Sequence, residues 1–185
     1  MLVEVRWHGR GGQGIVTVSR LLAYAALLDG KHVQAFPEFG PERRGAPVTG
    51  YTRISDETIT IHSHIYNPHI VVIVDPTLIG TVNMTLGLAK DGTIVANTEK
   101  DSATLKQDLR AEKAKIFTVN ATRIALDVLG RPIYNTAMLG ALVKASPIVT
   151  LDSIDKVVKE RFPGAVGEKN VAVIKRAYEE AKNVE

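Results

Sequence analysis

The first 28 residues pass from a strand pattern into a helical pattern through a turn rich in glycine. Apolar side chains alternate between Leu2 and Trp7, and apolar residues recur near helical spacing between Val16 and Leu28. The turn between the two segments contains Gly9, Gly11, Gly12 and Gly14. Glycine lets backbone N–H groups approach an anion closely, and a helix start adds partial positive charge at the same place. The segment therefore predicts a strand–turn–helix unit whose turn accommodates an anion.

The rest of the chain alternates between strand and helix patterns. Lys31–Phe36 is expected to form a second strand that closes a β-α-β unit, and Ile70–Val74 is a β-branched run typical of a strand buried on both faces. Gly92–Ala96 and Lys115–Val119 are expected to be further parallel strands. Helical patterns lie at residues 77–88, 102–109, 122–129, 136–145, 151–161 and 168–183.

Two further segments, Val48–Ile54 and Thr58–His62, alternate around a polar turn and predict an antiparallel hairpin. The fold class that follows is α/β, with a mostly parallel, Rossmann-like sheet flanked by helices, a β-hairpin insertion and a helical C-terminal tail. At this length we expect residues 1–185 to form a single domain.

Composition excludes several classes of function. The chain has no cysteine, so it has no disulfide, no catalytic thiolate and no thiolate-bound iron–sulfur cluster of its own. Its net charge is only +3 and 5% of its residues are aromatic, which argues against binding to nucleic acid. No apolar run reaches the roughly 18 residues of a membrane span. We therefore expect a cytoplasmic protein that binds neither nucleic acid nor a membrane.

The glycine turn has three interpretations. Gly9, Gly11 and Gly14 match G-x-G-x-x-G between a strand and a helix, which is the context of a dinucleotide fingerprint. That interpretation needs an acidic side chain near the end of the second strand to hold a ribose, and Glu38 lies in that region. The second interpretation is that the glycines only permit a tight turn and close packing of helix on strand. The third is a different phosphate-bearing ligand or a partner subunit.

Two polar side chains of the turn fit the third interpretation. Arg10 provides a guanidinium suited to phosphate, and Gln13 provides an amide that donates or accepts a hydrogen bond.

The loop Pro37–Pro47 follows the second strand and is expected to open on the same sheet edge as the glycine turn. It carries four charged residues on a stretch stiffened by prolines: Glu38, Glu42, Arg43 and Arg44. A solvated loop with weak Glu–Arg pairs is one interpretation. We favour the other, an interface or a clamp on a ligand.

The remaining candidates do not complete an active site. His62, His64 and His69 lie close together, but no carboxylate stands among them at ligand spacing, so we expect no metal site. His8 adjoins the glycine turn, and Asp75 ends a buried strand, where it orients a ligand or caps the next helix. No catalytic residue is assigned. The chain therefore has the character of one part of a larger catalyst.

Several segments, in order along the chain, resemble the gamma subunits of the 2-oxoacid:ferredoxin oxidoreductases, and the pyruvate type in particular. They are RWHGRGGQG (Arg6–Gly14), AFPEFGPERRGAP (Ala35–Pro47), Asn67–Asp75, Asn97-Thr98 and NTAMLGALVK (Asn135–Lys144).

The resemblance implies an assembly of alpha, beta, gamma and delta subunits. Such enzymes decarboxylate a 2-oxoacid on thiamine diphosphate with Mg, pass electrons through [4Fe-4S] clusters to ferredoxin and release an acyl-CoA. In the family, thiamine diphosphate and the clusters lie in the other subunits, which agrees with the absence of cysteine here. The resemblance implies a gamma domain that packs beside the active site and helps to bind CoA.

Transferred to this chain, the resemblance makes the glycine turn (Gly9–Gly14), Arg43 and Arg44 candidates for contacts with the phosphates of CoA. Burial of the same loops against the alpha subunit, as a scaffold, is an equal alternative. A stand-alone NAD- or FAD-dependent dehydrogenase is the alternative from another class. If the chain is a subunit, the isolated chain is expected to be inactive and to self-associate through its orphaned interface.

Overall fold

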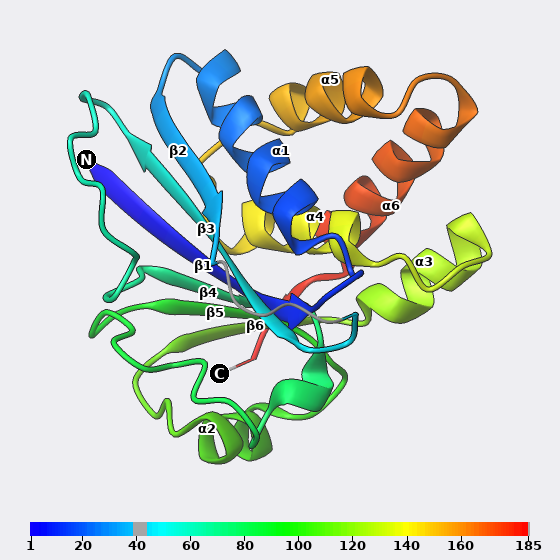
Figure 1. Ribbon diagram of the computed structural model, residues 1–185. Coiled ribbons are helices and arrows are strands. Elements are labelled where there is room, and N and C mark those ends of the chain that lie inside the picture. The colour runs from blue at the N-terminus through cyan, green and yellow to red at the C-terminus, as the bar shows by residue number, and fades with distance from the viewer. Residues whose placement is uncertain (39–43, 185) are drawn as a thin grey trace.

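The computed structural model describes residues 1–38 and 44–184. In this part of the chain seven strands form one sheet in the order β2-β3-β1-β4-β5-β6-β7 (Figure 1). Strands β1, β4, β5 and β6 are parallel, whereas β3 is antiparallel to both of its neighbours and β7 is antiparallel to β6. The strands are β1 Leu2–Arg10, β2 His32–Pro37, β3 Pro47–Ser55, β4 Ile70–Ile73, β5 Thr93–Asn97, β6 Lys115–Val119 and β7 Lys182–Asn183.

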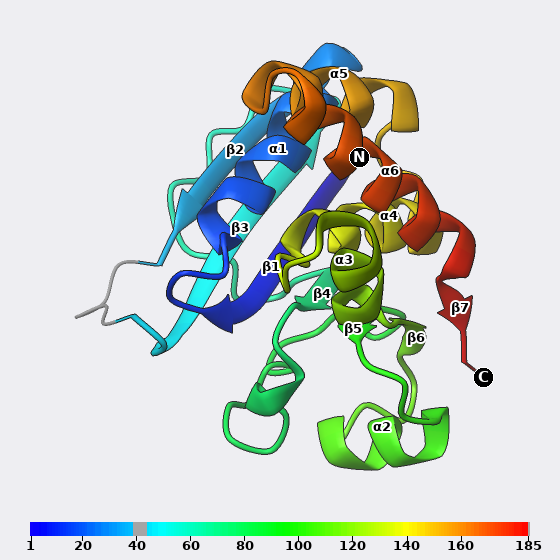
Figure 2. The same ribbon diagram turned by 90° about the vertical axis from the view of Figure 1, so that its right-hand side faces the viewer.

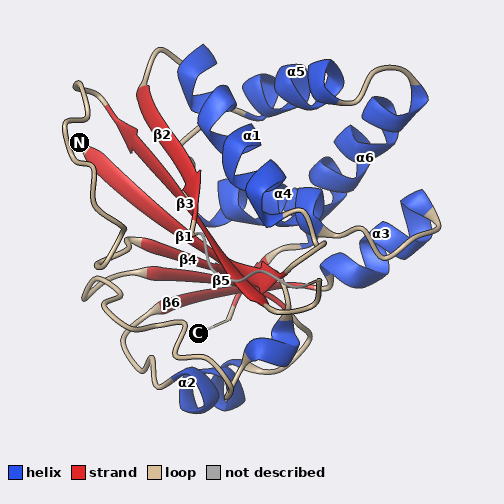
Figure 3. Ribbon diagram, in the orientation of Figure 1, coloured by secondary structure: helices blue, strands red, loops and turns tan. Residues whose placement is uncertain are grey.

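Helices cover the two faces of the sheet unequally. Helices α1, α3, α4, α5 and α6 lie on one face, and α2 lies on the other (Figures 2 and 3). None of the described helices is long and apolar enough to cross a membrane. The helices are α1 Ile15–Leu28, α2 Ser102–Leu109, α3 Ala121–Leu129, α4 Asn135–Ala145, α5 Leu151–Arg161 and α6 Ala165–Glu180, with a 3₁₀ turn, η1, at Pro76–Leu78.

The alternation in β1 explains how the glycine turn is held. Val3, Val5 and Trp7 point into the larger core, beneath α1. The indole N–H of Trp7 donates to the Thr52 hydroxyl at 3.1 Å, and that hydroxyl donates to the carbonyl of Ser19 in α1 at 2.9 Å. Strand, sheet neighbour and helix are thereby tied together directly behind the turn.

Most of the predicted elements are present, and the predicted fold class is confirmed. The strand pairing differs from expectation near the N-terminus. Strand β2 runs in the same direction as β1, but β3 lies between them, so the β-α-β unit encloses an antiparallel strand. The predicted pairing of Val48–Ile54 with Thr58–His62 is wrong, because both edges of β3 are already occupied by β1 and β2. The hairpin in this region joins β2 to β3 instead.

The helix expected at 77–88 is also absent, and only η1 forms there. Gly80 and Gly87 both adopt positive φ angles, of 85° and 75°, which breaks a helix. Arg6 of β1 binds this segment, since its Nη2 donates to the carbonyls of Met84 and Leu86 at 2.8 and 2.7 Å. At the end of the chain, the predicted helix 168–183 stops at Glu180 and is followed by β7.

Gly140 marks the closest approach of α4 to α6. A Cβ added there would overlap the carbonyl oxygen of Ile174 and lie 3.0 Å from the amide nitrogen of Tyr178. Glycine to alanine in an exposed helix raises stability by about 1 kcal/mol. Here we expect Gly140→Ala to lower the free energy of unfolding by about 2 kcal/mol, because the two helices must move apart. Urea denaturation measures the change.

The control for this substitution is Leu126→Ala on the exposed side of α3, which should change the free energy of unfolding by no more than about 0.5 kcal/mol. A Gly140→Ala variant as stable as the parent chain would contradict the packing described here.

Candidate functional site

The parallel strands end along one edge of the sheet, and we call this the carboxyl edge. β1 ends in the glycine turn, β4 is followed by Asp75, and Asn97 is the last residue of β5. In open α/β sheets ligands bind in the crevice outside this edge. The two described ends of the Pro37–Pro47 loop lie on the same edge, because Pro37 pairs with Gly50 and Pro47 pairs with Arg10. The candidate site is therefore the carboxyl edge around the glycine turn.

Asp75 is the centre of a hydrogen-bond network at this edge. Its Oδ2 accepts from Gln13 Nε2 at 2.6 Å and lies 3.2 Å from Arg10 Nε. Its Oδ1 accepts from the backbone N–H and the hydroxyl of Thr77 at 2.9 and 2.7 Å. The amide of Gln13 also donates to the phenol of Tyr134 at 3.0 Å. The network ties the glycine turn to η1 and to the start of α4.

Burial opposes ionisation of Asp75, but the hydrogen bonds from Thr77 and Gln13 and the charge of Arg10 outweigh it. The pKa of Asp75 consequently lies below its ordinary value. The pKa of the Tyr134 phenol is raised, first by burial and then by the negative charge of Asp75. At neutral pH the network therefore holds an ionised carboxylate and a neutral phenol.

The guanidinium of Arg10 takes part in the same network. Besides Asp75 it contacts the Thr77 hydroxyl, at 3.2 Å from Nε and 2.9 Å from Nη2, and Nη1 donates to the carbonyl of Gly45 at 3.1 Å. Gln13 is engaged in the same way, since its Oε1 accepts from the backbone N–H of Arg10 at 2.7 Å. The sequence singled out Arg10 and Gln13 but gave no sign of their partners Thr77 and Tyr134.

The glycines serve close packing at two positions. A Cβ at Gly9 would overlap the side chain of Ile15, and one at Gly14 would overlap the amide of Asn135. Gly14 also has φ 73°, which favours glycine, and forms the N-terminal cap of α1. Its carbonyl accepts from Asn135 Nδ2 at 3.3 Å, while the buried Asn135 Oδ1 has no partner within the described residues.

Several backbone groups of the glycine turn already form hydrogen bonds within the chain. Gly11 N–H donates to the carbonyl of Ala46, Gly45 N–H donates to the carbonyl of Gly11, and Gln13 N–H donates to the carbonyl of Arg10. Within the described residues the N–H groups of Gly12 and Gly14 have no such partner. These two groups are the ones that remain for an anion.

Arg44 is the arginine of the charged loop that the structure describes. Arg44 is exposed and passes over Gly12, where a Cβ would lie 3.7 Å from its Cγ and 3.8 Å from its Nε. Its side chain makes no ion pair or hydrogen bond in the part of the chain that the structure describes. Glu38 is occupied, because its Oε2 accepts from the Tyr51 phenol at 2.7 Å. Glu42 and Arg43 lie outside the described residues.

His8 is buried behind the edge. Its Nε2 accepts from Arg6 Nε at 3.1 Å, and burial together with the charge of Arg6 lowers its pKa to about 3. His8 is therefore neutral at physiological pH and does not act as an acid there. Among the other histidines, His62 and His64 are exposed and His69 Nδ1 accepts from the backbone N–H of Glu4 at 3.1 Å. Over residues 1–38 and 44–184 no metal-binding group of three or more His, Asp or Glu side chains occurs.

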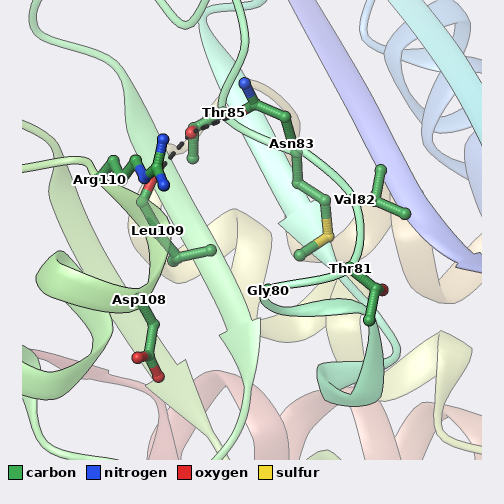
Figure 4. Close-up of a pocket in the computed structure, with 9 residues that line it drawn as sticks. Gly80, Thr81, Val82, Asn83, Thr85, Asp108, Leu109 and Arg110 are labelled. Atoms are coloured by element: carbon green, nitrogen blue, oxygen red, sulfur yellow. Dashed lines mark hydrogen bonds between the residues drawn. The ribbon is translucent and has the colours of Figure 1, made fainter.

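A separate pocket of about 230 Å³ lies on the α2 side of the sheet, between residues 80–85 and residues 108–110 (Figure 4). The hydroxyl of Thr85 bridges its two walls by donating to the carbonyl of Leu109 at 2.8 Å. Arg110 adopts a left-handed conformation with φ 50° at the end of α2. None of the side chains singled out in the sequence lines this pocket.

A nicotinamide site does not fit the glycine turn. In a dinucleotide-binding unit the acidic residue follows a strand that lies beside the first, whereas here β3 separates β2 from β1. The acid of that strand, Glu38, bonds to Tyr51. The edge does place Arg44 beside the N–H groups of Gly12 and Gly14, which have no backbone partner among residues 1–38 and 44–184, and these are groups of the kind that bind anions.

Comparison with known proteins places the chain in a family. Residues 4–180 match the model of the family described as pyruvate ferredoxin/flavodoxin oxidoreductase. The chain is 49% identical to the pyruvate/ketoisovalerate oxidoreductases common subunit gamma of Thermococcus litoralis, covering 96% of each chain. It is 48% identical to pyruvate synthase subunit PorC of Methanothermobacter marburgensis, covering 98% of this chain and 99% of that one.

Among solved structures, the pyruvate oxidoreductase subunit PORC of Thermotoga maritima superimposes with a TM-score of 0.90 at 43% identity, covering 100% of this chain and 99% of that one. These comparisons give no support to a stand-alone dehydrogenase. The chain belongs to the pyruvate ferredoxin/flavodoxin oxidoreductase family, in which it is a gamma-type subunit.

Proposed function

We propose that this chain is the accessory gamma subunit of a pyruvate-type 2-oxoacid:ferredoxin oxidoreductase and that its carboxyl edge holds the phosphates of CoA. The whole enzyme converts pyruvate, CoA and oxidised ferredoxin into acetyl-CoA, CO₂ and reduced ferredoxin. The observation that carries the proposal is the exposed Arg44 guanidinium above Gly12, beside backbone N–H groups without partners in the described chain. A guanidinium and backbone amides are the groups that proteins use for phosphate.

The remaining parts of the reaction belong to partner chains in this proposal. Alpha, beta and delta subunits carry the thiamine diphosphate, the Mg and the [4Fe-4S] clusters, and the assembly passes electrons to ferredoxin. The residues of this chain do not fit a cluster, because it has no cysteine. Its own residues bind and orient CoA: the glycine turn and Arg44 receive phosphate, and the Asp75 network holds the turn in place.

Arg44→Ala in the assembled enzyme tests the proposal. We expect the apparent KM for CoA to rise about tenfold or more, because a charge-assisted contact contributes about 1.5–3 kcal/mol. The KM for pyruvate should stay unchanged. Arg43→Ala is expected to act in the same direction.

The matched control is Lys113→Ala, which removes an exposed cation just before β6, at the opposite edge of the sheet. If the Arg44 variant assembles normally and its KM for CoA equals that of the control, the loop is a scaffold and the CoA assignment is wrong. Turnover of pyruvate by the isolated chain would contradict the accessory role.

A further inference from the structure

We propose that a basic groove on the face of the sheet that carries α1 and α3–α6 is the docking site for an acidic, amphipathic segment of a partner polypeptide. Two adjoining hollows of about 470 and about 200 Å³ form the groove, and both are lined by Thr17 and Arg161. The groove lies between α1, the connection from α3 to α4 and the connection from α5 to α6, which occupy the same side of the sheet (Figure 1). The inference rests on the proposed subunit role, because an assembly supplies such a segment.

The charge of the groove has one sign. Its lining includes four exposed cations and no carboxylate: Arg20, Arg131, Arg161 and Lys169. Within the described chain none of the four makes an ion pair. The neighbouring Glu168 already pairs with Lys159 at 3.0 Å, so it does not neutralise the groove.

Three helices begin beside these cations. The caps of α1, α4 and α6 are Gly14, Tyr134 and Gly164, and no cap side chain among them bonds to its helix. The first turn of each helix contributes a lining residue: Thr17, Thr136 and Val166. Helix starts carry partial positive charge, which adds to the field of the side chains.

The groove is also apolar. Ile133 and Val166 are 50% and 58% exposed on its rim, and Tyr24 is 54% exposed at its far end. Phe162 lines the groove and is covered by the Arg161 guanidinium, 5.1 Å from the ring centroid. Exposed apolar side chains of this size beside one another indicate a surface that a partner covers.

The positive charge and the exposed apolar side chains of the groove together indicate what occupies it. A small phosphate compound satisfies the cations but leaves the apolar rim in water. A peptide segment in which Asp or Glu residues alternate with apolar ones satisfies both, since carboxylates pair with arginine and apolar side chains cover Ile133, Val166 and Phe162. The complementary charge therefore points to an acidic polypeptide segment.

Photo-crosslinking in the assembled enzyme identifies the occupant. Benzoylphenylalanine is placed at Val166 in the groove and, as the control, at Leu86, which is 66% exposed on the opposite side of the sheet. We expect the Val166 probe, and not the Leu86 probe, to link to a segment of another subunit that contains several Asp or Glu residues among apolar ones. A link only to a second copy of this chain, a link to a segment without carboxylates, or no link would overturn the proposal.

Charge reversal provides the quantitative test. Arg131→Glu combined with Lys169→Glu is expected to weaken assembly about tenfold or more, with a loss of salt dependence. Lys113→Glu with Lys156→Glu, two exposed cations outside the groove, should leave assembly unchanged. Equal assembly of the two double variants would overturn the proposal, provided that both full chains show the same thermal unfolding.

The outcome is separable from that of the CoA proposal. Reversal in the groove should leave the KM for CoA unchanged in the complexes that form, whereas Arg44→Ala should change that KM without weakening assembly. Either result can therefore fail while the other holds.

Discussion

Replacing Arg53 by methionine should lower the free energy of unfolding by about 4 kcal/mol, since breaking a buried ion pair costs about 3–5 kcal/mol. Arg53 is only 1% exposed, and its Nε donates to Glu4 Oε1 at 2.8 Å. Its Nη2 donates to the carbonyls of Ser63 and His64 at 2.7 and 3.1 Å, and the guanidinium lies 5.4 Å from the centre of the Phe36 ring. The variant leaves a carboxylate and two carbonyls without these donors.

Guanidinium denaturation of the full chain measures this loss. The matched control is Arg123→Met, an exposed arginine on α3, which should change the free energy of unfolding by no more than about 0.5 kcal/mol. A loss below about 1 kcal/mol for Arg53→Met would show that segment 56–69 is not held to the sheet in this way.

The second large expected effect is a loss of folding stability at acid pH. The pKa of His8 is about 3 in the folded chain, against an ordinary value of 6.5, because the neutral form is buried beside Arg6. Because the pKa of His8 is lower in the folded chain than in the unfolded chain, the unfolded chain binds this proton at a higher pH as acid is added. The contribution of His8 to stability is therefore complete well above pH 6.5. It is lost as the pH falls through 6.5 towards 3, with a slope that approaches about 1.4 kcal/mol for each pH unit.

Between pH 6.5 and pH 4.5 we therefore expect His8 to remove about 2 kcal/mol of stability. His8→Gln keeps an acceptor for Arg6 and should remove most of this slope. His62→Gln, at an exposed position, should retain it. The measurement is urea denaturation at several pH values, and equal slopes for the parent chain and His8→Gln would show that His8 is not buried in the neutral form.

Elements with local boundary signals were predicted well from the sequence. Lys115–Val119 and Leu151–Arg161 match β6 and α5 in full, and 102–109 matches α2. The helix starts carry side-chain caps that the sequence displays, since Asp101 accepts from Thr104 N–H and Thr150 accepts from Ser153 N–H. Such signals act within one turn of helix.

The errors arose where distant segments compete. Thr58–His62 has the alternation of a strand, but β3 offers it no free edge. The candidate site shows the same limit, because Gln13 meets partners 62 and 121 residues away along the chain. The sequence offered Arg10 as a guanidinium suited to phosphate, but it did not reveal that Asp75 and Thr77 contact this side chain in the folded chain. Arg44 has no such partner in the described part of the chain, and no local pattern in the sequence distinguishes it from Arg10.

The position of β3 between β1 and β2 also bears on synthesis by the ribosome. The first strand of the chain forms its nine-pair ladder with β3 and pairs on its other side with β4, which ends at Ile73. Contacts so far apart in sequence are slow to form and leave strand edges exposed until they do. The nascent strand β1 must therefore wait until translation has passed Ile73 before both of its edges are protected.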